Sequence, residues 1–72
     1  MGWTMKTKYA INYTSMPYGK IATIPKGTSV IPADNLPQGG YWAEKWEGMT
    51  TIQESWLDNY GFHIAQGAVC ND

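Results

Sequence analysis

The chain has 72 residues, with 5 basic and 6 acidic side chains and a formal net charge of −1. This length fits one small domain and excludes a doubly wound α/β enzyme, a TIM barrel or a two-domain cleft. All five basic residues are scattered lysines, whereas proteins that bind duplex nucleic acid cluster lysine and arginine, so duplex nucleic acid is not an expected partner.

The N-terminal segment carries weak structural signals. Residues 1–8 hold an isolated Trp3 among polar residues, so we predict a flexible segment there and a single domain over residues 9–70. Residues 9–14 alternate Tyr, Ile and Tyr with Ala, Asn and Thr, which is the period of a half-buried strand.

Three more strands are predicted in the first two thirds of the chain, separated by turns and a loop rich in Pro and Gly. In the last of them Trp42 and Trp46 share one face and Tyr41 lies on the other, so the alternation does not decide which face is buried. The predicted strands are residues 20–24, 29–33 and 41–46.

A short helix is predicted over residues 51–59. Thr51 and Glu54 have the spacing of a capping box. Ile52, Trp56 and Tyr60 follow at intervals of four residues, with Leu57 beside them, as a single apolar stripe.

The end of the chain completes the predicted fold. Asn59 or Gly61 can end the helix. A fifth and last strand is predicted to begin at 62–64 and to continue through a 3₁₀ turn at 65–67 to 68–70.

The order of these features resembles an SH3-like barrel of the bacterial or phage type. Residues 22–31 are similar to the second strand, diverging turn and third strand of that superfold, residues 41–46 to its strand with paired aromatics, and residues 61–69 to its closing strand and 3₁₀ turn. The resemblance implies a mainly β fold: a small five-stranded antiparallel barrel with one short helix inserted near residues 51–59. Tyr41 matches an aromatic ligand position, whereas the 3₁₀ turn lacks the ligand-contacting Pro and Tyr.

The residues that could carry catalysis are sparse. His63 and Cys70 cannot form a zinc set on their own, and the carboxylates of Glu54 and Asp58 fit the solvated face of a helix. A Gly-rich phosphate loop is also missing. We therefore expect a protein that is not an enzyme and that uses neither a metal nor another cofactor.

The aromatic residues are the strongest functional signal. Ten aromatic side chains exceed what so small a core can enclose, although Trp42 or Trp46 is expected to bridge helix and barrel together with Trp56. The surplus is expected to form an exposed patch of the kind that marks an interface. The predicted binding residues are Tyr18, Tyr41, Trp46, Trp56 and Tyr60.

These observations favour a small non-enzymatic module that binds a protein partner, resembling accessory or inhibitor proteins of phages and mobile elements. Two alternatives stay open: a structural homo-oligomer that buries its own aromatic patch, and a protein that stacks the bases of single-stranded nucleic acid. A lone cysteine favours a reducing, cytoplasmic location. With no signal peptide and no apolar run of about 18 residues, neither export nor a membrane partner is expected.

Overall fold

The computed structural model describes residues 5–71, which form short strands around a single α-helix. The elements are β1 (Met5–Thr7), β2 (Ile11–Ser15), β3 (Gly19–Ile24), β4 (Ser29–Pro32), β5 (Tyr41–Ala43), α1 (Thr51–Asn59), β6 (His63–Ile64), the 3₁₀ helix η1 (Gln66–Ala68) and β7 (Val69–Asn71). The predictions of a mainly β fold and of one helix at residues 51–59 are confirmed.

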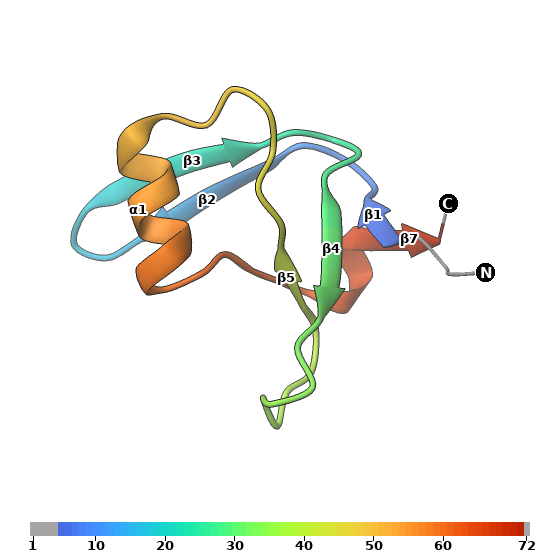
Figure 1. Ribbon diagram of the computed structural model, residues 1–72. Coiled ribbons are helices and arrows are strands. Elements are labelled where there is room, and N and C mark those ends of the chain that lie inside the picture. The colour runs from blue at the N-terminus through green and yellow to red at the C-terminus, as the bar shows by residue number, and fades with distance from the viewer. Residues whose placement is uncertain (1–4, 72) are drawn as a thin grey trace.

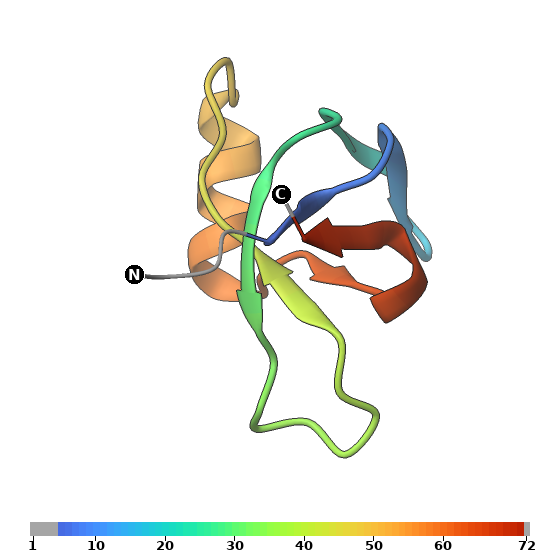
Figure 2. The same ribbon diagram turned by 90° about the vertical axis from the view of Figure 1, so that its right-hand side faces the viewer.

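The strands form two antiparallel sheets. Five of them pair in the order β6-β5-β4-β1-β7, and β2 and β3 pair as a separate hairpin. The five-stranded sheet is strongly curled (Figure 2), and α1 lies alongside the hairpin (Figure 1). The strands predicted at 9–14 and 20–24 form this hairpin as β2 and β3, and within residues 5–71 the hairpin does not pair with the larger sheet.

The larger sheet gains β1, which lies in the segment expected to be flexible. Met5 pairs with Val30 on one side and with Asn71 on the other, so β1 joins β4 to β7. Thr7 is buried, donates its hydroxyl to the carbonyl oxygen of Pro25 at 2.9 Å and accepts the N–H of Thr28 at 3.1 Å. These bonds order a segment whose polar composition predicts no strand; Trp3 lies outside the described residues.

The strand predicted over residues 41–46 ends early, at Ala43. The N–H of Glu44 still donates to the carbonyl of Ser29 at 2.9 Å, but the chain then leaves the sheet towards α1. The strict alternation of faces ends with the strand, so Trp46 packs on the core although Trp42, its predicted companion on one face, lies outside it.

The core is small and centres on Phe62, which is fully buried. Its ring meets Tyr13 of β2 edge-on at 4.9 Å and Trp46 at 5.3 Å. Phe62 therefore connects the hairpin to the larger sheet. The other buried members of this cluster are Ala22, Ile24, Val30, Ala43, Ile64, Ala68 and Val69.

The N-cap of the helix lies one residue earlier than predicted. Thr50, not Thr51, is the N-cap: its hydroxyl accepts the N–H of Gln53 at 3.1 Å, and the Gln53 side chain accepts the N–H of Thr50 at 3.1 Å. The predicted pair of Thr51 and Glu54 is thus replaced by Thr50 and Gln53, because glutamine serves in a capping box as glutamate does. Gln53 Nε2 also donates to the carbonyl of Ile21 at 3.4 Å, which ties α1 to β3.

Among residues 5–71, the structure has no helix with the length and apolar character needed to cross a membrane. The nine residues of α1 are fewer than half of the ~20 that a spanning helix requires.

Candidate functional site

Three of the five predicted binding residues gather where the β2–β3 turn meets α1. The Tyr18 ring contacts the Trp56 ring edge-on, with centroids 6.1 Å apart, and Trp56 contacts Tyr60 with centroids 4.6 Å apart. Tyr18 is placed by a turn that contains a cis Met16–Pro17 bond. We call Tyr18, Trp56 and Tyr60 the aromatic patch.

The aromatic patch is largely open to solvent. Tyr18 is 72% exposed and Tyr60 68% exposed, while Trp56 between them is half-buried. Two further apolar side chains near it in the chain are also exposed: Met16 in the same turn at 91%, and Ile52 one helical turn before Trp56 at 77%. The patch therefore offers apolar surface that folding leaves uncovered.

The exposure of Ile52 and Tyr60 corrects the predicted apolar stripe. The helix packs through Gln53, Trp56 and Leu57, which are half-buried. Residues three and four apart lie on one helical face, so a stripe drawn only at intervals of four drifts around the helix. The drift leaves Ile52 in solvent.

Trp56 also carries a polar group without a partner. Its Nε1 atom is buried, and among the described residues it has no hydrogen-bond partner. A buried donor without an acceptor costs about 1–3 kcal/mol, so the position of this indole is not optimal for the stability of the isolated chain.

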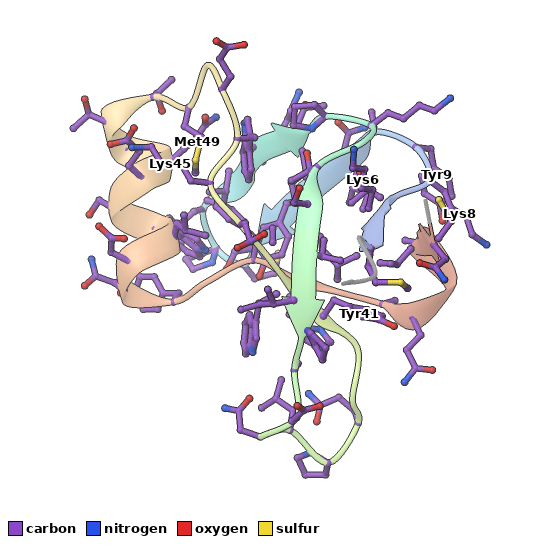
Figure 3. The ribbon with its side chains drawn as sticks, turned by 45° about the vertical axis from the view of Figure 1, so that its right-hand side comes forward. Lys6, Lys8, Tyr9, Tyr41, Lys45 and Met49 are labelled. Carbon is purple, nitrogen blue, oxygen red and sulfur yellow. The ribbon has the colours of Figure 1, made fainter. Side chains whose placement is uncertain are left out.

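The other two predicted binding residues lie elsewhere. Trp46 is half-buried against Phe62, so its ring belongs to the margin of the core. Tyr41 is half-buried on β5, where it is opposite Pro32 and Ile64 in the strand register. Figure 3 shows Tyr41 across β4 from α1. Alternation in the sequence could not separate these rings from the exposed ones, because the chain leaves the sheet after Ala43.

A groove of about 310 Å³ opens beside the aromatic patch, between the C-terminal end of α1 and β5. Its lining includes Tyr60, which it shares with the patch, and Ala43, which is buried and lies at its floor. Asp58 and Asn59 also line the groove and are exposed. The lining residues are Trp42, Ala43, Leu57, Asp58, Asn59, Tyr60 and Gly61.

Trp42 is held in this groove from several sides. A Cβ atom on Gly61, whose φ is +77°, would lie 2.9 Å from the Trp42 ring, so the absence of a side chain lets the indole rest on the backbone. The His63 ring meets the Trp42 ring edge-on, with the ring centroids 5.4 Å apart. The Trp42 Nε1–H donates to Asn35 Oδ1 at 3.4 Å. Sequence reasoning placed Trp42 at the helix–barrel contact and missed the groove, since the fit depends on Gly61, nineteen positions along the chain.

Charge is unevenly divided along the chain. Residues 5–33 contain four lysines and no carboxylate, whereas residues 34–71 contain one lysine and five carboxylates. That lysine, Lys45, pairs with Glu54 at 3.2 Å. Asp58, the one charged residue that lines the groove, has no ion pair within residues 5–71.

A second hollow, of about 370 Å³, lies between the β3–β4 turn and residues 45–47. Its lining mixes the cations Lys26 and Lys45 with the carboxylate of Glu47. Because Lys45 is already paired with Glu54, this hollow presents no single chemistry to a ligand.

The one histidine of the chain contacts a backbone carbonyl. His63 Nε2 lies 2.7 Å from the carbonyl oxygen of Gly39; because a carbonyl only accepts, this nitrogen carries the proton. In the part of the chain that the structure describes, no three His, Cys, Asp or Glu side chains are grouped as metal ligands would be. The site that this chain offers is a surface of rings and a groove.

No protein-family model, curated protein or solved structure matches the chain.

Proposed function

We propose that this chain is a non-enzymatic binding module that docks on a protein partner through the aromatic patch. The observation that carries the proposal is the exposure of Tyr18 and Tyr60 on either side of Trp56. Tyrosine and tryptophan are prominent among the residues that dominate binding energy at protein interfaces, since they bury a large area and lose few rotamers.

The finer description of the fold belongs to this proposal. An SH3-like barrel is supported by the antiparallel pairing of β1 with β7 and by η1 directly before β7. We extend the proposal to a cytoplasmic accessory or inhibitor protein of a phage or mobile element, for which the small size of the chain and its lone Cys70 are the support.

Capture from a bacterial lysate, compared between variants, tests the proposal. The full chain is immobilised as wild type, as the double variant Tyr18→Ala/Tyr60→Ala, and as Tyr9→Ala. Tyr9 is a matched control because it is 53% exposed and lies outside the aromatic patch. We expect one protein to be retained by wild type and by Tyr9→Ala, and to fall at least about tenfold with the double variant.

Two results contradict the proposal. Equal capture by all three forms shows that the aromatic patch does not bind. In sedimentation equilibrium, the second contradicting result is an average mass of the wild type that rises with protein concentration while the double variant stays a monomer. That result assigns the aromatic patch to self-association.

A further inference from the structure

We infer that the groove between α1 and β5 receives a basic side chain, lysine or arginine, of the protein partner. The inference rests on the proposed function, because the groove shares Tyr60 with the aromatic patch, and it specifies the chemistry of that partner. A segment that covers the patch would thus place one cationic residue between Trp42 and the end of α1.

The walls of the groove suit the stem and the head of such a side chain. Trp42, Leu57 and Tyr60 supply apolar and aromatic surface, along which the methylenes of a lysine or arginine can pack. Ammonium and guanidinium groups are attracted to the faces of tryptophan and tyrosine rings. Trp42 is already oriented by Gly61 and His63, so its ring is not reordered on binding.

Asp58 brings to the groove a negative charge that no described residue neutralises. Asp58 is exposed there and has no ion pair within residues 5–71. It lies in the last turn of α1, where the helix dipole is also negative and where the helix has no basic residue. Cations are the favoured residues at a helix C-terminus. A basic side chain of the partner therefore supplies the positive charge that the last turn of α1 lacks.

The backbone at this helix end adds acceptors. The N–H groups of Tyr60 and Gly61 both donate to the Trp56 carbonyl, at 2.8 and 3.0 Å. In the described part of the chain, the carbonyls of Leu57, Asp58 and Asn59 therefore receive no backbone N–H. Carbonyls at a helix end need donors, which lysine and arginine provide without carrying any acceptor.

The occupant of the groove is tested by NMR titration of the ¹⁵N-labelled full chain. Two capped tripeptides serve as probes: acetyl-Gly-Lys-Gly-amide, and the same peptide with uncharged norleucine in place of lysine. We expect the lysine peptide to shift the Trp42 indole resonance and the amides of residues 57–61 saturably, and to bind at least about threefold more tightly than the norleucine peptide.

Two isosteric variants assign the charge preference. Asp58→Asn removes the charge at the groove, and Asp34→Asn removes one from the exposed loop that precedes β5. We expect Asp58→Asn to lower the preference for lysine, because only the ring faces and the helix-end carbonyls then favour it, and Asp34→Asn to leave it unchanged. Equal binding of both peptides by wild type, or an unchanged preference in Asp58→Asn, overturns the inference. If the groove resonances shift as the protein itself is concentrated, without any peptide, the groove binds a lysine of a second copy of this chain. That result overturns the inference as well.

This experiment separates the inference from the proposed function. If lysate capture depends on Tyr18 and Tyr60 but the two peptides bind equally, the docking function stands and the assigned chemistry of the groove is wrong. If the lysine peptide is preferred while capture ignores the aromatic patch, the groove binds cations and the docking proposal fails.

Discussion

Single glycines determine whether the loop before β5 can close onto β6. Gly40 has φ +82°, and a Cβ atom there would lie 2.6 Å from His63 Nε2 and 2.7 Å from the carbonyl oxygen of Ile64. Gly27 has nearly the same φ, +84°, but a Cβ atom there would meet nothing within 4 Å. Both positions require a positive φ, but only at Gly40 do neighbouring atoms fill the space that a Cβ atom would occupy.

Gly40→Ala is expected to destabilise the protein more than Gly27→Ala. Both variants incur about 1–2 kcal/mol for a left-handed residue with a Cβ. Gly40→Ala additionally displaces the His63 ring from the Gly39 carbonyl and pushes against the backbone of β6. Urea unfolding followed by tryptophan fluorescence measures the difference, and equal midpoints for the two variants would contradict the close approach.

The burial of Thr7 shows the limit of sequence reasoning at the scale of one residue. A threonine among lysines and methionine predicts exposure, yet Thr7 is buried because its hydroxyl both donates to Pro25 and accepts from Thr28. The partners lie 18 and 21 positions away, so local pattern contains no trace of them. His63, in contrast, alternates along the chain with the buried Phe62 and Ile64 and is itself half-buried.

At the scale of elements, local signals located most of the strands and the helix. Turns with Pro and Gly bracketed β3 and β4, and the S/T-x-x-E/Q spacing located the start of α1 to within one residue. The strand after Gly40 was predicted too long, because the exit of the chain from the sheet at Ala43 follows from the position of α1. The same long-range cause separated Trp46 from Trp42.

The cap of α1 provides a direct comparison between neighbouring threonines. Thr50→Ala removes the acceptor for the Gln53 N–H and is expected to lower the free energy of unfolding by about 1 kcal/mol. Thr51 is exposed in the first turn of α1 and has no capping bond. Thr51→Ala is therefore expected to change the free energy of unfolding by less than about 0.5 kcal/mol. Thermal unfolding by circular dichroism checks both, and a larger loss from Thr51→Ala would assign the cap to the wrong residue.

At the scale of the molecule, a sequence with surplus aromatic residues predicted both a ring-supported core and an exposed remainder. Phe62, Trp46 and Tyr13 form the ring-supported core, and Tyr18 and Tyr60 form the remainder. Which ring falls into which group depends on how the hairpin and α1 pack on the curled sheet. That packing is tertiary, and periodicity within single elements does not encode it.

The two sheets are expected to fold as one cooperative unit through Phe62. Phe62→Ala removes the fully buried ring between Tyr13 and Trp46, a change that costs about 3–5 kcal/mol in a packed core. A core in a chain of this size rarely supplies more than about 3–5 kcal/mol, so the variant is expected to be largely unfolded. Ile31→Ala, at a side chain that is 48% exposed, is the control and should remain folded. The dispersion of amide resonances in NMR spectra shows whether each variant is folded. If the hairpin resonances of Phe62→Ala stay dispersed while those of the larger sheet collapse, the two sheets fold independently.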